Sequence, residues 1–273
     1  MDSEVIAERF VRARLDAEAL SAFPGTLPTT LNSAYAYQDQ AIALWPDHLV
    51  GWKVSGIGQT WLRRVGEDRL VGPIFRRGIR LAPPDALIDV PVFRGGFAAI
   101  EAGFVFRLGA DADSDRAHWT PEEAARLVTG LHVGIEIAAS PLAAINELGP
   151  TAVVADFGSH GGLLLGPAIS GWHSRAYDSL TCETFIDGRS VGCGAVRSMR
   201  GGLLAALAFA LGRCARRGLP MKAGYLVATG AVTGSHGIRI GQSACVRFGG
   251  VAELLCRALP AVRRAGSVIS RSV

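Results

Sequence analysis

The pattern of the sequence changes at Pro83 and Pro84, and this change constrains the fold more than any other feature. Before the two prolines, apolar residues recur at helical spacing over about 2–20 and again over 34–44. After them, short runs of β-branched and aromatic residues are separated by glycines, a pattern typical of strands. The sequence therefore predicts an α+β protein with a mainly helical N-terminal region at 1–82 and a β-rich C-terminal domain at 83–273.

Two helices and six strands are predicted in the second region. The first helix has a complete start signal, with Thr120 as cap, Pro121 at the first position and Glu123 at the third. The second helix runs over about 203–217 and ends at Gly218. We expect the strands to form a mixed, strongly bent or barrel-like sheet. The predicted strands are Phe97–Arg107, Val133–Ala139, Thr151–Ala155, Cys182–Ile186, Gly224–Thr229 and Ser243–Phe248.

Composition excludes several classes of protein. Hydrophobic residues make up 49% of the chain and charged residues 19%, which is too apolar for a disordered protein. The longest apolar run, over 203–211, is nine residues long, whereas a membrane-spanning helix needs roughly 20. The N-terminus lacks the basic and apolar regions of a secretory signal. We therefore expect a cytoplasmic protein that does not enter a membrane.

Nearly all the basic charge comes from arginine, because Lys53 and Lys222 are the only lysines. Two arginine clusters occur, and neither is interleaved with aromatic residues as a nucleic-acid groove would be. We expect both clusters to form solvated faces and no nucleic acid to bind. The clusters are Arg76, Arg77 and Arg80, and Arg213, Arg216 and Arg217.

Three acids lie in or beside predicted strands. Glu101 in AAIEAGFVF and Glu136 in HVGIEIAAS are each the single acid of an apolar stretch, and Asp156 follows TAVVA. A buried carboxylate has to be paired, protonated or bound to a cation. Pairing with arginines, and for Asp156 a purely local role at the end of a strand, are the structural alternatives. Together the three acids are a candidate site for Mg²⁺ or Mn²⁺, which prefer oxygen ligands.

Lys53 and His160 are the other candidates for chemistry. Lys53 lies in GWKVSGIG, where glycines let a ligand approach the backbone, and it could hold a substrate carboxylate or transfer a proton. The alternative is a surface lysine with a packed stem. His160 lies in the glycine-rich loop FGSHGG beside Asp156, where a solvated loop histidine is the alternative. The chain has no phosphate-binding loop or dinucleotide fingerprint.

Several segments, in collinear order over nearly the whole chain, resemble the 2-keto-4-pentenoate hydratase and 4-oxalocrotonate decarboxylase group of the fumarylacetoacetate hydrolase superfamily. They include GWKVSGIGQ, LVGPIF, FAAIEAGFVFRLG, HVGIEIAASPLAAINELGPTAVVADFG, FIDGRSVG and KAGYLVATGAVTG. The resemblance implies a mixed β fold preceded by a helical region. It also implies Mg²⁺ or Mn²⁺ held by a Glu-x-Glu pair and a third glutamate.

The resemblance assigns roles to individual residues. Glu101 matches the first metal ligand and Glu136 the third. Lys53 matches a lysine at the substrate, and Asp68 matches an acid that takes part in proton transfer. The segment ADFGSHGG corresponds to a loop near the site, but it has Ser159 and His160 where an amide-rich stretch is expected in close relatives. The substrate-binding residues expected from it are Asp156, Ser159 and His160.

The sequence departs from the family pattern at Gly103, where the second metal ligand is expected. Residues i and i+2 of a strand share a face, which is why a Glu-x-Glu spacing directs both carboxylates into one site. With glycine at this position, one of three anionic ligands is missing. Metal binding is then weakened or lost, unless water or a nearby group such as His160 or Asp156 substitutes for it.

The favoured function is a lyase that hydrates a 2-hydroxy-2,4-dienoate, or 2-keto-4-pentenoate type, substrate through metal stabilisation of an enolate. A 2-oxo diacid decarboxylase and a specialised biosynthetic lyase are alternatives on the same fold. A third alternative is a catalytically degenerate homologue that binds a related enzyme. Self-association into a homo-oligomer is also expected from the family and the apolar content.

Overall fold

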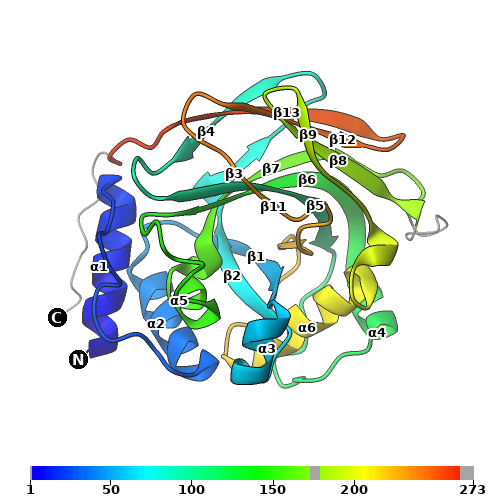
Figure 1. The fold of residues 1–273 in the computed structure, drawn as a ribbon. Coiled ribbons are helices and arrows are strands. Elements are labelled where there is room, and N and C mark those ends of the chain that lie inside the picture. The colour runs from blue at the N-terminus through cyan, green and yellow to red at the C-terminus, as the bar shows by residue number, and fades with distance from the viewer. Residues whose placement is uncertain (1, 173–178, 265–273) are drawn as a thin grey trace.

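The computed structural model describes residues 2–172 and 179–264, which form two β-sheets flanked by helices (Figure 1). The larger sheet has eight strands: β1 (Leu49–Gly56), β2 (Arg69–Phe75), β3 (Ile79–Leu81), β5 (Phe97–Leu108), β6 (Val128–Ser140), β7 (His160–Ala168), β10 (Leu226–Ala228) and β11 (Ser235–Gly237). Its order is β2-β1-β10-β5-β6-β7-β3, and β11 pairs with β5. The long antiparallel pair β5 and β6 forms the middle of this curled sheet.

The smaller sheet has five strands and lies above the larger one in Figure 1. It consists of β4 (Leu87–Val92), β8 (Thr181–Ile186), β9 (Arg189–Ala195), β12 (Ser243–Phe248) and β13 (Ala252–Pro260), in the order β4-β13-β12-β8-β9. Asp187 and Gly188 connect β8 to β9 with φ angles of 48° and 76°. These left-handed values are those of a tight hairpin turn, as Asp-Gly predicts.

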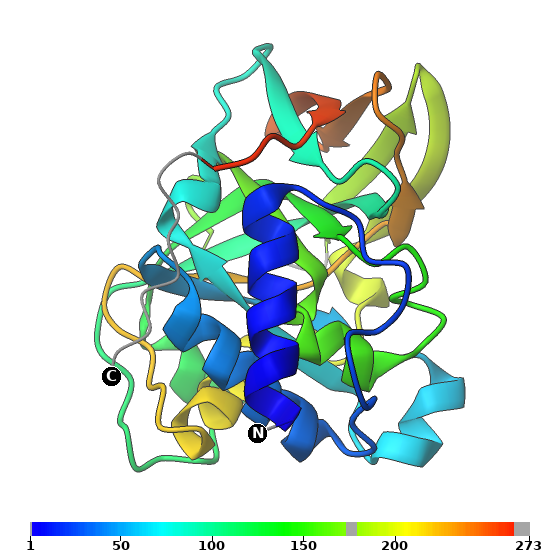
Figure 2. The ribbon, with the colours of Figure 1, turned by 90° about the vertical axis from the view of Figure 1, so that its left-hand side faces the viewer.

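The helices gather mainly on the side of the larger sheet that faces away from the smaller one (Figure 1). They are α1 (Asp2–Asp16), α2 (Leu31–Leu44), α3 (Gln59–Val65), α4 (Pro121–Ala125), α5 (Pro150–Ala155) and α6 (Gly202–Arg216). Helix α1 stands along one flank, as the turned view in Figure 2 shows. No helix within the described ranges is long and apolar enough to span a membrane.

The architecture confirms the predicted α+β class with N-terminal helices and a bent mixed sheet. The capping box of Thr120 and Glu123 is formed as predicted. Strands β1, β2 and β3 precede residue 83 but belong to the larger sheet. The division into domains at residue 83 stays a prediction, and the larger sheet takes strands from both sides of it.

The strand predicted over Thr151–Ala155 is wrong, because these residues form helix α5. Gly149 has a φ of 93° and Pro150 takes the first helical position, which together start a helix. A short apolar run does not by itself distinguish a strand from a buried helical turn. The predicted strand over 224–229 is shorter in the structure, where β10 covers only 226–228.

The second arginine cluster is not the solvated face that the sequence predicts. The guanidinium carbons of Arg213 and Arg217 lie 5.1 and 4.4 Å from the ring centroid of Tyr35. Arg217 also lies over the ring of Trp52, at 5.0 Å. Planar guanidinium groups stack on aromatic faces, so the two arginines pack α6 against α2 and β1.

A buried glutamine on α2 forms hydrogen bonds with three other elements. The Gln38 side chain on α2 is fully buried, and its Nε2 donates to the carbonyl oxygens of Val71 at 3.1 Å and Val154 at 2.8 Å. Its Oε1 accepts a hydrogen bond from Arg217 at 2.8 Å. One side chain therefore ties α2 to β2, α5 and the end of α6.

We expect Gln38→Leu to lower the free energy of unfolding by about 2–3 kcal/mol, because it leaves buried polar groups without partners. Urea denaturation measures this. The matched control is Gln40→Leu on the same helix, since the Gln40 Oε1 has no hydrogen-bond partner among the described residues. The control should not lower stability, because it removes a buried polar atom that has no partner to lose. Equal losses in the two variants would contradict the bridging role of Gln38.

Candidate active site

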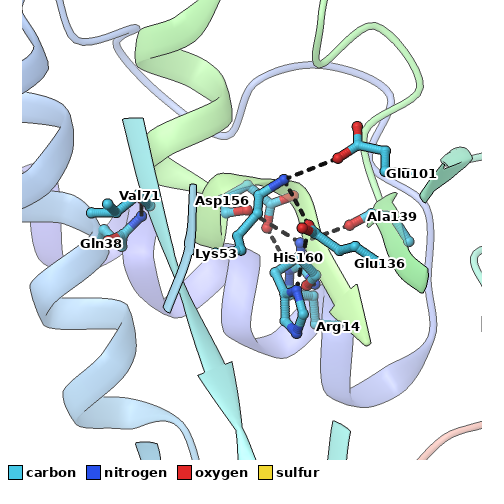
Figure 3. Close-up of polar contacts among 9 residues, drawn as sticks. All are labelled: Arg14, Gln38, Lys53, Val71, Glu101, Glu136, Ala139, Asp156 and His160. Atoms are coloured by element: carbon cyan, nitrogen blue, oxygen red, sulfur yellow. Dashed lines mark hydrogen bonds and ion pairs between the residues drawn. The ribbon is translucent and has the colours of Figure 1, made fainter. Parts of the chain in front are cut away.

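Two glutamates and one lysine meet in the interior of the larger sheet (Figure 3). Glu101 on β5 and Glu136 on β6 are directly opposite each other in the strand register. The Nζ of Lys53, from β1, lies 2.7 Å from the Glu136 Oε1 and 3.8 Å from the Glu101 Oε2. Among the residues that the structure describes, the cation that pairs with these acids is thus the lysine and not an arginine.

Burial is the largest influence on the pKa of all three groups, and it disfavours their charged forms. For Glu136, the Lys53 ammonium and His160 together outweigh burial, so its pKa is lowered. For Lys53, the two carboxylates outweigh burial and raise the pKa. For Glu101, burial prevails over the more distant ammonium and over a hydrogen bond from Ser235, so its pKa is raised. The arrangement favours an ionised Lys53–Glu136 pair beside a Glu101 that takes up a proton easily.

Local structure directs Lys53 inward through strand alternation. Trp52, its neighbour on β1, is fully buried in the main apolar core, so Lys53 points to the other face of the sheet. Gly72 lies opposite Lys53 on β2. A Cβ atom at Gly72 would lie 2.2 Å from the Phe157 carbonyl oxygen, so only glycine lets the loop after α5, which contains Phe157, pack this closely against β2. That loop then covers the stem of the lysine.

The loop after α5 has an unusual backbone. Phe157, Gly158 and Ser159 have consecutive left-handed φ angles of 54°, 63° and 58°. Such angles cost about 1–3 kcal/mol for residues other than glycine and persist only where surrounding contacts enforce them. The strained turn directs Ser159 to one side of the loop and His160 to the other.

Arg14 of α1 provides these enforcing contacts (Figure 3). Its side chain is buried, pairs with the Asp156 carboxylate and donates to the His160 and Ala139 carbonyl oxygens, each at 2.9 Å. The His160 Nδ1 lies 3.5 Å from the Glu136 Oε1. Burial lowers the pKa of His160 although Glu136 opposes the shift, which favours a neutral imidazole.

A cavity of about 220 Å³ opens beside Lys53 and Glu101. Ser159 contributes to its wall, and the Ser159 Oγ is buried without a hydrogen-bond partner among the described residues. Trp61 and Asn146 also line the cavity, although no motif in the sequence predicts a functional role for either residue. Polar lining comes also from Ser55, Asn146 and Ser235, and apolar lining from Ile57, Trp61, Leu70, Phe97 and Val153.

The structure brings some predicted residues to this cavity and not others. The residues Lys53, Glu101 and Ser159 line it. Glu136 does not line it but forms an ion pair with Lys53. Asp156 is fully buried against Arg14 and does not line it. Asp68 lies elsewhere, in ion pairs with Arg69 and Arg200. Roles for Asp68 and Asp156 in the reaction stay predictions.

Comparison with known proteins identifies the family. The family model for the fumarylacetoacetate (FAA) hydrolase C-terminal domain matches residues 74–269, and the chain belongs to this family. A search of curated proteins found no significant match.

Solved structures of the same fold include enzymes with different reactions. The 4-oxalocrotonate decarboxylase from Pseudomonas putida G7, complexed with magnesium and adipate, is 20% identical with a TM-score of 0.77, over 94% of this chain and 97% of that one. The fumarylpyruvate hydrolase from Pseudomonas aeruginosa, in complex with Mn²⁺ and pyruvate, is 14% identical with a TM-score of 0.57, over 78% and 90%. The 2-hydroxyhepta-2,4-diene-1,7-dioate isomerase from Mycobacterium marinum is 14% identical with a TM-score of 0.56, over 78% and 77%.

The residues of this chain do not fit a divalent metal ion held by three carboxylates. Among the residues that the structure describes, no three His, Cys, Asp or Glu side chains come together as a metal site. The Lys53 ammonium already lies between the two glutamates and would repel a second cation there. A Cβ atom at Gly103 would lie 2.4 Å from the Gly230 carbonyl oxygen, so the backbone occupies the direction that a second ligand would take.

We expect Gly103→Ala to lower the free energy of unfolding by about 1–3 kcal/mol, because the added methyl group overlaps the Gly230 backbone. Thermal or urea denaturation measures the change. Gly130→Ala in β6 is the matched control, since a Cβ atom there comes no closer than 3.5 Å to any neighbour. If both variants are equally stable, the backbone around Gly230 can move to admit a side chain at position 103. The Gly230 backbone would then not exclude a second ligand there.

Proposed function

We propose that the chain is a lyase that adds water to a small 2-hydroxy-2,4-dienoate, the tautomer of a 2-keto-4-pentenoate. The observation that carries the proposal is the buried Lys53 ammonium, held between two glutamates in the wall of the cavity. In this proposal the ammonium supplies the positive charge that stabilises the enolate, in place of the metal expected from the family.

Each residue of the cluster has a separate task. Lys53 binds the substrate carboxylate and the oxygen on carbon 2, and the unpartnered Ser159 hydroxyl donates to the same end of the substrate. Glu136 stays ionised and holds the ammonium in place. Glu101, whose pKa is raised, carries the proton that moves.

The proposed reaction has two proton-balanced stages. In ketonisation, Glu101 gives its proton to the terminal carbon 5 of the substrate, and the proton of the 2-hydroxyl group returns to the Glu101 carboxylate. Water then adds its oxygen to carbon 4 and leaves one proton on carbon 3, so the net change is the gain of one water molecule. The enolate formed in both stages carries its negative charge on the oxygen beside Lys53.

The lining of the cavity favours a monocarboxylate. Lys53 is the only basic side chain among the described residues that line it, so a second substrate carboxylate would have no cation to pair with. The apolar side chains of Trp61, Phe97 and Val153 suit an uncharged diene instead. The volume of about 220 Å³ is below the roughly 300–1,000 Å³ of drug-sized pockets, as a five- or six-carbon acid requires.

Decarboxylation of a 2-oxo diacid is the second candidate. The fold likeness over 94% of the chain to a 4-oxalocrotonate decarboxylase supports it. The absence of a second cation among the described lining residues argues against it.

The first test is turnover of 2-hydroxypenta-2,4-dienoate, followed as loss of dienol absorbance by the purified protein. We expect turnover that neither EDTA nor added Mn²⁺ changes by more than about twofold, because Lys53 supplies the charge. Decarboxylation of 2-oxohex-3-enedioate in the same buffers tests the second candidate. Chelator-sensitive turnover would contradict the role of Lys53, and no turnover of either acid would favour a degenerate binding homologue.

The second test is Lys53→Gln, which removes the positive charge and keeps a similar length. We expect kcat to fall by about 10²–10³-fold, the usual effect of losing one group that stabilises a developing oxyanion. Lys222→Gln is the control, because this other lysine is exposed and pairs with Asp111 at the surface. A similar kcat in both variants would rule Lys53 out of the chemistry.

A further inference from the structure

A second cavity, of about 450 Å³, lies on the other side of the loop that carries His160. Residues of this loop are divided between the two cavities: Gly158 and Ser159 line the first, and Phe157 and His160 line the second. The second cavity is bounded further by α1, by the turn after β2 and by the chain that follows β13. It shares no lining residue with the proposed catalytic cavity.

The charge of this second cavity is one-sided. Its described lining contains four arginines and no acidic residue. Arg14 at the bottom is already paired with Asp156, but Arg77 at the rim is exposed, and its guanidinium pairs with no carboxylate in the described part of the chain. Burial lowers the pKa of Arg264, and the positive charges of neighbouring arginines lower it further. The Asp47 carboxylate opposes this shift. These cations favour an anionic ligand.

Aromatic rings form one wall of the cavity. Trp45, Phe75 and Phe157 pack against one another with ring centroids 5.2–5.5 Å apart. Phe93 also contributes to the lining, and the Arg14 guanidinium lies 5.7 Å from its ring centroid. A surface of ring faces and edges suits a planar apolar body better than a compact inorganic ion.

An unsatisfied polar atom marks the same wall. His160 is 6% exposed, and its Nε2 is buried without a hydrogen-bond partner among the described residues. A buried polar group without a partner costs about 1–3 kcal/mol, so a ligand atom that pairs with it gains binding energy. The cations, the rings and this nitrogen thus line one cavity, whose volume of about 450 Å³ is sufficient for a small organic anion.

We propose that the second cavity binds an aromatic monocarboxylate, with the carboxylate at the arginine rim and the ring against the aromatic wall. The sequence suggested only a solvated face for Arg77 and Arg80, because it does not show what lies opposite them. The structure places both across from Phe157 and His160 in one cavity. This proposal is independent of the reaction proposed for the first cavity.

Isothermal titration calorimetry with benzoate tests the proposal on the full-length protein. We expect one binding event per chain, weakened about tenfold or more by Arg77→Gln, because a charge-assisted hydrogen bond is lost. Arg76→Gln is the matched control, since Arg76, next to Arg77 in the chain, is also exposed but does not line the cavity. Equal weakening in both variants, or no binding to the wild-type protein, would overturn the proposal.

Two further titrations locate the benzoate and define its chemistry. Lys53→Gln should leave benzoate affinity unchanged within about twofold, and a loss of binding there would mean that benzoate enters the catalytic cavity instead. Acetate and inorganic phosphate should bind at least tenfold more weakly than benzoate. If either binds as tightly, the cavity recognises charge alone and the aromatic wall has no part in recognition. None of these readouts requires turnover, so failure of the proposed reaction would leave them intact.

Discussion

The burial of three charges at one point is the constraint on which the rest of this structure depends. Removing an ion from water costs several kcal/mol, and the cost is offset only when opposite charges meet in good geometry. Lys53, Glu101 and Glu136 come from β1, β5 and β6, so the sheet has to curl until these strands present their inner faces to one another. Burial raises the pKa of Glu101, whereas Glu136, which lies closer to the Lys53 ammonium and also to His160, has a lowered pKa in spite of its burial.

The second requirement is a loop held in strained backbone angles beside that cluster. Arg14 crosses from α1 to bind Asp156 and two backbone carbonyl oxygens, so a residue near the start of the chain fixes a turn about 145 residues later. The same turn separates the two cavities and places Ser159 in one and His160 in the other. The N-terminal helix is therefore part of the construction of the site, whatever the division into domains.

Gly103 connects the local geometry to the chemistry. A fold can keep its strands and its cavity while the source of positive charge changes, because the electrostatic demand of an enolate is met by any suitably placed cation. Here the Gly230 carbonyl group fills the direction of a second carboxylate, and the Lys53 ammonium lies between the remaining two. Fold likeness to metal-containing enzymes therefore does not transfer their ligand set, and the proposed lyase relies on its own residues.

Local pattern in the sequence predicts the class of fold, the strands β5 and β6, and the three charged residues of the cluster, since periodicity and isolated charges in apolar runs are local signals. It did not determine that a lysine rather than an arginine pairs with the acids, that 151–155 is helical, or that Arg213 and Arg217 stack on aromatic rings. Neither the position of Asp68 away from the cavity nor the arginine-lined second cavity was visible in it. These were decided only by the tertiary structure, because ion pairs, stacking and cavities depend on which distant segments the curled sheet brings together, and local pattern does not encode that distance.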